Sequence, residues 1–295
     1  MTAATLPTGG APAGSRVPRS GRRAGVVSAL KYVTLVVGSF VTMIPILVVF
    51  TTSLKTEDEF REGAPFDAPD DWLNFENYAT AFSDGGMATA FVNTTIILAV
   101  SLFGTIILGS MAAYAINRFE FKLKPLVLTL FLAATFMPGV TMQVATFQVV
   151  SDLGLFNSRW AAIALFTGTD IISIYIFLQF LNSIPRSLDE AALLDGASYF
   201  TIYRRIILPL MKPAIATVAI IKGVAIYNEF YIPFLYMPSR DLGVVSTSLF
   251  KFKGPFGTQW EIISAGVVIT IIPSLIVFLL LQRFIYNNYM TGATK

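Results

Sequence analysis

Six apolar stretches divide the chain, and each is long enough to cross a bilayer as a helix. They run from about 29–53, 88–116, 125–148, 160–182, 213–237 and 262–284. About 20 apolar residues span the hydrocarbon core, and a helix satisfies its own backbone polar groups there. The pattern therefore predicts an all-α integral membrane protein with six transmembrane helices. Composition agrees, because 55% of the 295 residues are hydrophobic and only 13% are charged.

The polar segments between these stretches predict the domain organisation. Residues 1–27 are rich in Gly, Pro, Ala and Arg without hydrophobic period, which predicts a disordered tail. Residues 28–87 form the first span with an acidic loop, 88–284 a five-helix core, and 285–295 a second tail. Arg22-Arg23 before an apolar run also resembles a signal peptide. The uncharged run from Tyr32 to Leu54 is longer than that of a signal peptide and lacks an A-x-A cleavage site, which favours a retained span.

Basic residues are distributed unequally over the two sides of the predicted spans. Fourteen of the 21 Lys and Arg lie in the N-terminal segment through Lys31, the 117–124 loop, the 187–213 segment together with Arg186, and the C-terminal end, against six in the other connections. Because positive charge is retained on the cytoplasmic side, both termini and the 187–213 segment are predicted to be cytoplasmic. The acidic 54–87 connection is predicted to lie outside. The basic residues flank membrane spans, so they do not indicate binding to nucleic acid.

Several chemistries are made improbable by what the sequence lacks. There is no Cys and no His, so disulfides, thiolate metal sites and the commonest general base are all missing. No G-x-x-x-x-G-K-[ST] motif occurs, so any ATP that drives this protein must bind another chain. The prediction is a protein that is not an enzyme and binds no cofactor.

One long polar-rich segment, 187–213, separates the fourth and fifth apolar stretches. Ser187 and Glu190 have the spacing of a capping box, and Gly196 supplies a helix stop. A second helix is predicted from about Ser198 to Pro209. The resulting elbow has an apolar side and a basic end, made respectively by Leu188, Ala191, Ala192 and Leu193 and by Arg204, Arg205 and Lys212.

The spacing of the elbow residues resembles a known family. Glu190-Ala191-Ala192, then Gly196, then Ile206-Ile207-Leu208-Pro209 is similar to the EAA loop of permeases in ATP-binding-cassette importers. The resemblance implies a cytoplasmic coupling helix that docks on a separate ATPase subunit. The residues it assigns to this contact are Glu190, Ala191, Ala192, Gly196, Ile206, Leu208 and Pro209. The alternative is an amphipathic helix lying on the membrane surface.

Three further stretches extend the resemblance to about residues 28–295. Asp71 to Tyr78 resembles an external W-x-N-x-x-N-Y stretch, Asn93-Thr94 an N-[ST] pattern, and Ala112 to Phe119 an A-Y-A-x-x-R-x-x-F pattern. All are similar to maltose-type carbohydrate permeases, specifically the partner without a large external domain. This implies the type I importer fold, a prokaryotic plasma membrane, and a C-terminal tail that reaches into the ATPases. The implied partners are a homologous second permease, ATPase subunits that hold ATP and Mg, and an extracellular sugar-binding lipoprotein.

Small residues and one proline predict the packing of two spans. Gly109 and Ala113, four residues apart, allow a neighbouring helix to approach closely. Met137-Pro138-Gly139 is predicted to kink the third span, because proline cannot donate to the helix ladder.

Polar residues inside the fourth and fifth spans are candidates for the substrate path. Asp170 is costly in lipid and must face protein or water. Lys222 and Glu229 are seven residues apart, hence on one helical face, and Pro233 frees the Glu229 carbonyl to accept another donor. Tyr227-Asn228-Glu229-Phe230 resembles a W-N-[DE]-F stretch of the family. The candidate path residues are Asp170, Tyr227, Asn228 and Glu229.

Other interpretations of these polar groups stay open. Asp170, Lys222 and Glu229 could form buried bridges between helices, or serve as the ion relay of a proton- or sodium-driven secondary transporter. The absence of an internal inverted repeat disfavours the secondary transporter. An importer permease for another small solute, such as an amino acid, shares the EAA loop and is a further alternative.

Overall fold

A computed structural model describes residues 21–139, 141–168, 170–254 and 257–292, with side chains between 27 and 280. The chain divides into two compact units, residues 1–48 and 49–295. The first unit contains most of helix α1 (Gly21–Thr52), whose side chains are almost all exposed, as expected of a helix surrounded by lipid. Because α1 begins at Gly21, the helix starts inside the segment predicted as a tail. Residues 1–20 and 293–295 lie outside the described residues.

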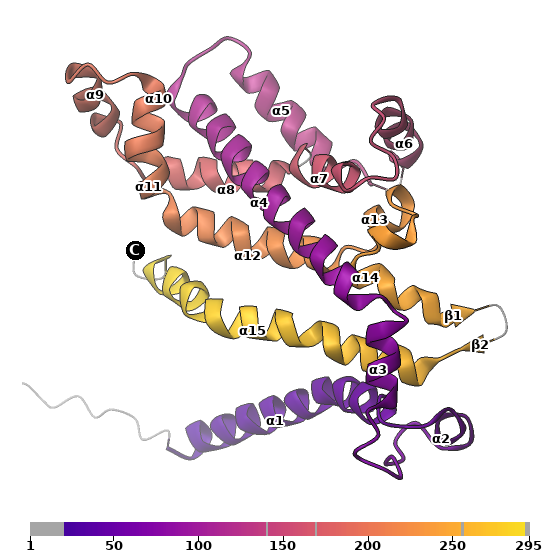
Figure 1. The fold of residues 1–295 in the computed structure, drawn as a ribbon. Coiled ribbons are helices and arrows are strands. Elements are labelled where there is room, and N and C mark those ends of the chain that lie inside the picture. The colour runs from indigo at the N-terminus through magenta and orange to yellow at the C-terminus, as the bar shows by residue number, and fades with distance from the viewer. Residues whose placement is uncertain (1–20, 140, 169, 255–256, 293–295) are drawn as a thin grey trace, which may run out of the picture. The chain divides into compact units, whose positions relative to one another are not determined.

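The second unit is almost entirely helical (Figure 1). Before the elbow lie α2 (Glu57–Glu62), α3 (Glu76–Ser83), α4 (Met87–Arg118), α5 (Lys124–Thr135), α6 (Gln143–Asp152), α7 (Arg159–Gly168) and α8 (Ile171–Leu181). The elbow contains α9 (Ser187–Leu194), α10 (Tyr199–Ile202), the π-helix η1 (Tyr203–Ile207) and α11 (Leu208–Leu210). After it come α12 (Lys212–Asn228), α13 (Tyr231–Tyr236), the 3-10 turn η2 (Arg240–Leu242), α14 (Val245–Ser248), the 3-10 turn η3 (Leu249–Phe252) and α15 (Trp260–Gly292). Between η3 and α15, strands β1 (Lys253–Gly254) and β2 (Gly257–Thr258) form a small antiparallel hairpin in which Lys253 pairs with Thr258.

Helix α4 is the central element of this unit and contacts α7, α8, α12 and α14. A Cβ built on Gly109 would lie 3.4 Å from the ring of Phe177 in α8, and Ala113 is fully buried. The predicted close approach along this face of α4 is therefore confirmed. Gly104 extends it, because a Cβ there would lie 2.7 Å from Thr167 of α7.

Three of the expected spans are interrupted. Among the described residues, three helices are long and apolar enough to cross a membrane alone, within α1, α4 and α15. Two bent pairs, α7 with α8 and α10–α11 with α12, raise the number of candidate spans to five. The third predicted span is broken rather than kinked. Helix α5 ends at Thr135, and a turn in which the Thr141 N–H donates to the Pro138 carbonyl separates it from α6. Proline lacks the N–H that would continue the ladder.

The fourth and fifth predicted spans are each two helices. Asp170 precedes the first turn of α8, so the continuous 160–182 helix is replaced by α7 and α8. α12 ends at Asn228, and Glu229 has extended backbone angles, φ −70° and ψ 119°. The last helix is longer than predicted, since α15 continues to Gly292 and leaves most of the 285–295 segment helical.

Candidate functional site

Helix α9 ends in a Schellman motif built on Gly196. Its φ is +80°, in the left-handed region that disfavours residues with a Cβ. The Gly196 N–H donates to the Leu193 carbonyl over 3.0 Å, and the Ala197 N–H donates to the Ala192 carbonyl over 2.9 Å. These two bonds satisfy carbonyls that the helix end leaves open. The predicted stop at Gly196 is confirmed.

The predicted capping box at the start of α9 is wrong. Ser187 is already the first helical residue, and Arg186 occupies the N-cap without a side-chain cap bond among the described contacts. The chain enters α9 through a turn instead. The Glu190 N–H, which the Ser187 hydroxyl would have to cap, donates instead to the Arg186 carbonyl over 3.1 Å, so the capping box has no free donor.

The burial pattern of α9 is the reverse of an ordinary amphipathic helix. It buries Asp189 and Ala192, which are 7% and 8% exposed, whereas Glu190 and Ala191 are exposed. The leucines of the helix face outward as well, and Leu194 is 90% exposed. An acidic and apolar surface is therefore presented away from the rest of the unit.

Asp189 holds α9 to the C-terminal end of α4. Arg118 Nη2 lies 3.0 Å from Asp189 Oδ2, and both side chains are less than a tenth exposed. The Tyr114 hydroxyl donates to Asp189 Oδ1 over 3.1 Å, and Arg118 Nη2 also donates to the Ile184 carbonyl over 3.1 Å. Burying a charge this deeply is costly unless it is paired and hydrogen-bonded, and here it is both.

The second arm of the elbow begins where it was predicted. The Ser198 hydroxyl accepts from the Thr201 N–H as an N-cap of α10. The helix widens to the π-helix η1 before Pro209, and it bends by 72° between Leu210 and Lys212. Ile206 and Leu208 are half-buried against the core, while Pro209 is exposed. The basic side chains Arg204, Arg205 and Lys212 are also exposed.

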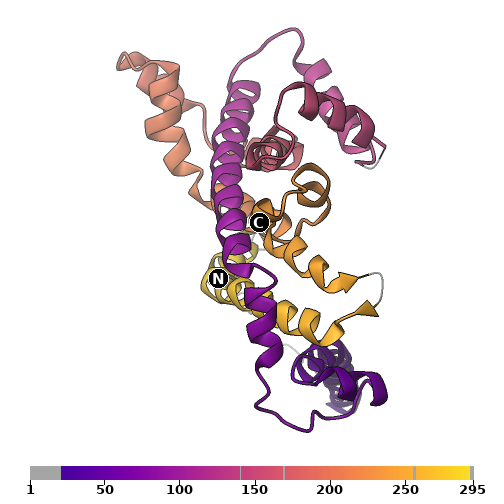
Figure 2. The ribbon, with the colours of Figure 1, turned by 45° about the vertical axis from the view of Figure 1, so that its right-hand side comes forward.

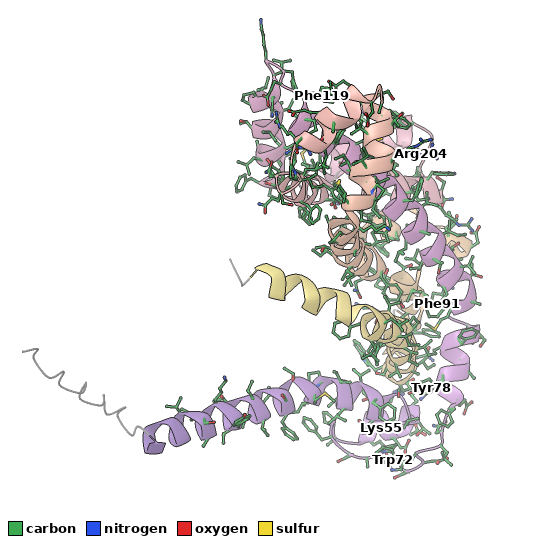
Figure 3. The ribbon with its side chains drawn as sticks, turned by 90° about the vertical axis from the view of Figure 1, so that its left-hand side faces the viewer. Lys55, Trp72, Tyr78, Phe91, Phe119 and Arg204 are labelled. Atoms are coloured by element: carbon green, nitrogen blue, oxygen red, sulfur yellow. The ribbon has the colours of Figure 1, made fainter. Side chains whose placement is uncertain are left out.

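Aromatic rings fix this second arm against α4. Tyr203 is buried, and its hydroxyl shares a 2.8 Å hydrogen bond with Ser110 of α4. The rings of Phe119 and Tyr199 meet edge to face, with centroids 4.9 Å apart. Figure 3 places Phe119 and Arg204 toward one end of the second unit and Tyr78, Lys55 and Trp72 toward the other. The elbow and the acidic 54–87 segment therefore lie at opposite ends.

The first candidate path residue is paired. Lys222 Nζ of α12 lies 3.1 Å from Asp170 Oδ1, and Ser173 also donates to this carboxylate. The pair joins α12 to the residue that directly precedes α8. Of the three charges that could have formed bridges between helices, Asp170 and Lys222 do so.

The remaining candidates lie at the end of α12 but point to different partners. The Tyr227 hydroxyl donates to the Thr270 carbonyl of α15 over 2.8 Å, and the Asn228 amide donates to the Val224 carbonyl of its own helix. Glu229 lies beyond the end of α12, so the expectation that it shares a helical face with Lys222 is wrong. Its Oε1 accepts from the Tyr231 N–H over 2.8 Å and caps α13.

Two further observations complete this region. The Glu229 carbonyl accepts from the Ser246 hydroxyl over 2.6 Å, as expected of a carbonyl without a helical donor. Asn228 is exposed and Tyr227 and Glu229 are half-buried, so Asn228 is the most accessible polar side chain of this stretch.

The Asp71 to Tyr78 stretch and the Asn93-Thr94 pair have structural roles. The Asn77 amide donates to the carbonyls of Ser53 and Lys55 over 3.0 and 2.7 Å, and the Tyr78 hydroxyl bonds to Ser53. Trp72, by contrast, is 53% exposed. Buried Asn93 donates to the carbonyls of Asp241 and Gly243 over 2.8 and 2.9 Å. In the part of the chain that the structure describes, no cluster of acidic side chains suits a metal ion.

Comparison with known proteins decides the family. Residues 105–289, a segment that includes the elbow and both candidate regions, match the family described as binding-protein-dependent transport system inner membrane component. The chain belongs to this family. The permease is therefore a membrane subunit of a binding-protein-dependent transport system, and the predicted membership of the importer-permease family is confirmed.

Relatives of the permease extend over nearly its full length. It is 29% identical over 279 residues to the melibiose/raffinose/stachyose import permease protein MelC of Bacillus subtilis, covering 92% of this chain and 99% of that protein. It is 30% identical over 271 residues to the diacetylchitobiose uptake system permease protein NgcG of Streptomyces coelicolor, covering 91% and 89%. Against the probable starch degradation products transport system permease protein AmyC of Thermoanaerobacterium thermosulfurigenes it is 30% identical over 275 residues, covering 91% and 98%.

Solved structures support the fold. A chain of a bacterial ABC transporter involved in the import of the acidic polysaccharide alginate aligns with a TM-score of 0.77. The identity is 22%, and the alignment covers 90% of the permease and 98% of that chain. At this identity the likeness shows the fold alone, and that fold agrees with the family found from the sequence.

Sequence reasoning missed the residues that hold the elbow in place. No site role is predicted from the sequence for Tyr114, Arg118 or Asp189, although Arg118 belongs to the A-Y-A-x-x-R-x-x-F pattern. The available signal was charge placed next to apolar spans: Arg118 ends a 32-residue helix, and Asp189 directly precedes Glu190. The pairing of two such charges depends on a turn of the chain that periodicity does not specify.

Proposed function

We propose that the permease is one of two membrane subunits of an ATP-driven importer of carbohydrates, with oligosaccharides as the substrate class. The observation that carries the substrate class is the near-complete alignment with relatives named as permeases for melibiose, raffinose, stachyose, diacetylchitobiose and starch degradation products. No single sugar is specified, because those relatives differ among themselves. A homologous second permease would complete the pathway, and an extracellular sugar-binding lipoprotein would deliver the substrate.

The coupling step is assigned to α9. Its exposed face, with Glu190, Ala191 and Leu194, suits a groove on a separate ATPase subunit that binds ATP and Mg. Buried contacts at Asp189 and the turn at Gly196 would keep this face in a fixed pose. When the ATPases close on ATP, α9 would move with them and the spans would open outward to accept sugar.

Orientation follows the same logic. The elbow with Arg204, Arg205 and Lys212 is proposed to lie in the cytoplasm with both termini, in a prokaryotic plasma membrane. The acidic 54–87 segment lies at the opposite end of the second unit, which supports an external location. Six spans are proposed, in which α5 and α6 together supply the third span.

Asn228 and Glu229 are proposed to line the sugar path, with Tyr227 contributing to its wall. Amide and carboxylate groups beside aromatic rings suit a hydroxyl-rich solute, since the rings pack on apolar sugar faces and the polar groups bond to hydroxyls. Asp170, paired with Lys222, is proposed to face the path rather than lipid.

A permease for another small solute is the main alternative. An ion-coupled transporter is less well supported, because Asp170 is already paired with Lys222 and Glu229 caps α13. The test is reconstitution of both permeases, the ATPase and the binding protein in liposomes, with labelled stachyose, diacetylchitobiose and an amino acid as solutes. ATP-dependent uptake of an oligosaccharide that survives an uncoupler is expected. Uptake of the amino acid alone, or uptake abolished by the uncoupler at constant ATP, contradicts the proposal.

A further inference from the structure

Helix α4 holds a polar segment at each of its ends. At the C-terminal end, Arg118 and Tyr114 bind Asp189 of α9. The same end also grips the chain before α9, since Asn117 donates to Asn182 over 2.6 Å and Arg186 donates to the Asn117 carbonyl over 2.8 Å. These contacts make α9 a fixed extension of α4 rather than a free loop.

The N-terminal end of α4 holds the segment between α13 and α15. Asn93 is fully buried, donates to the Asp241 and Gly243 carbonyls, and accepts from Arg159 Nε over 2.8 Å. The neighbouring Thr94 hydroxyl accepts from the Val245 N–H over 3.0 Å. Backbone groups of residues 241–245 are therefore bound by two adjacent side chains of α4.

Between these two ends α4 is uninterrupted. It has 32 residues and no proline, and Figure 2 shows it as one continuous helix with α9 and α10 beside its C-terminal end. From Asn93 to Arg118 the rise is about 37 Å, at 1.5 Å per residue. A helix of this length, packed against α7 and α8, moves as a rigid element more readily than it bends.

We propose that Arg118, Asn93 and Thr94 are positioning residues. Through them, α4 transmits the movement of α9 to residues 240–248 at its other end. None of the three touches substrate in this assignment. Arg118 fixes α9 on α4, and the Asn93-Thr94 pair fixes the distant segment on the same helix. The inference rests on the proposed docking of α9 on an ATPase.

The first experiment tests the fixed pose without any solute. Because this chain has no Cys, cysteines can be introduced at Leu188 of α9, which is exposed and outside the proposed docking residues, and at Leu108 of α4, and spin-labelled without background from its own thiols. The assembled complex should give one narrow distance distribution, and Arg118→Gln should broaden it. Arg118→Lys keeps the charge and should give an intermediate width. An unchanged distribution in Arg118→Gln overturns the assignment of Arg118.

The second experiment tests transmission along α4. In the assembled complex, Arg118→Gln and Thr94→Val should each lower ATP hydrolysis stimulated by the binding protein about tenfold, within the usual range of allosteric coupling, while basal hydrolysis is kept. The double variant should fall no further, because either change already breaks the same connection. Arg61→Ala, which removes an arginine from an exposed ion pair with Glu57, is the matched control.

The outcomes separate the inference from the proposed function. Additive losses in the double variant mean that the two ends act independently, which overturns transmission through α4. A wild-type complex that transports sugar while both variants behave normally overturns the inference and leaves the proposed function standing. If α9 does not contact the ATPase in the wild-type complex, the proposed function is contradicted. The distances between the two spin labels would still show whether Arg118 fixes α9 on α4.

Discussion

The ammonium of Lys222 and the carboxylate of Asp170 are 3.1 Å apart, with side chains 17% and 10% exposed. Two charges from different helices are therefore neutralised at the break between α7 and α8. In lipid or in a protein interior, removing one member leaves an uncompensated charge, whereas removing both can be nearly neutral. Comparing the variant that removes one charge with the variant that removes both therefore tests whether the pair has a structural role or a role in transport.

Lys222→Met alone is expected to destabilise the permease by about 3 kcal/mol or more, because Asp170 is left unpaired. Asp170→Asn combined with Lys222→Met should recover most of the loss, as judged by thermal unfolding of the purified complex. If the double variant is stable and transports sugar normally, the pair is a structural bridge. If it is stable but does not transport, Asp170 belongs to the path. A single variant as stable as wild type contradicts the ion pair itself.

The effect of a substitution at Gly196 should depend only on how well the new residue adopts the left-handed backbone conformation. No atom lies within 4 Å of a Cβ built there, so the cost is the left-handed φ, about 1–2 kcal/mol for an ordinary residue. Gly196→Val should therefore leave the permease inserted but misdirect α9, with loss of ATPase co-purification. Gly196→Asn should retain more binding, because asparagine tolerates this region. Gly38→Ala, equally uncrowded but without a positive φ, serves as the control. Equal binding by the Val and Asn variants would rule out the backbone as the cause.

Glu190 is expected to act through its charge. Since α9 has no capping box, Glu190→Gln removes no cap and should leave helix and fold unchanged. Glu190→Lys places a positive charge in the first turn, where the helix dipole disfavours it by about 0.3–1 kcal/mol, and reverses the charge offered to the ATPase. ATPase affinity measured on immobilised permease should fall far more for Lys than for Gln. Equal affinities for wild type and Glu190→Lys would remove Glu190 from the coupling surface.

Much of this organisation follows from local signals in the sequence. The elbow was predictable because Gly196 and Ser198 are local signals that need no tertiary partner, and α4 because its apolar run is uninterrupted. The prediction of the capping box is wrong for an equally local reason: the Arg186 carbonyl already accepts the hydrogen bond from the Glu190 N–H that Ser187 was expected to accept.

Long-range contacts explain what was missed. The Arg118–Asp189 pair joins residues 71 positions apart, and the Asn93 contacts join residues about 150 apart. Hydropathy predicts continuous spans over 125–148 and 213–237. It measures the length of an apolar run and carries no information on which hydrogen-bond partner each backbone group has. The breaks lie where Pro138 and Glu229 take part in other hydrogen bonds.

The carboxyl group of Glu59 is expected to make the stability of the segment after α1 depend on pH. Hydrogen bonds from the backbone N–H groups of Thr56 and Asp70 lower the pKa of this carboxyl below its ordinary value of 4.5. A folded-state pKa below the unfolded value contributes stability above the ordinary pKa, which is lost as pH falls through the lowered value. The protection factors of the α2 amides, which compare each exchange rate with the intrinsic rate at the same pH, should therefore be lower at pH 3 than at pH 7. Glu59→Gln should have lower protection factors at pH 7 and change less between the two; an unaltered pH response in that variant would contradict the role of Glu59.

Asn228 and Glu229 give the sharpest test of the substrate path, because their structural contributions differ. Asn228 is exposed, and among the described residues its side chain bonds within its own helix, so Asn228→Ala should leave the fold intact and lower sugar uptake. Glu229 caps α13, and Glu229→Ala should cost about 1 kcal/mol, as for the loss of other side-chain caps.

Glu229→Gln separates the two roles of Glu229, because its amide oxygen can still accept from the Tyr231 N–H while the negative charge is gone. Uptake by Glu229→Gln should fall while thermal stability and basal ATP hydrolysis stay near wild type. Thr217, on the same helix α12, lies near its start, and Thr217→Val provides a control for removal of a polar group away from the proposed path. If Glu229→Gln transports normally and Glu229→Ala loses both stability and uptake, the carboxylate is a helix cap only and the path lies elsewhere. If Asn228→Ala also transports normally, the end of α12 is not part of the path.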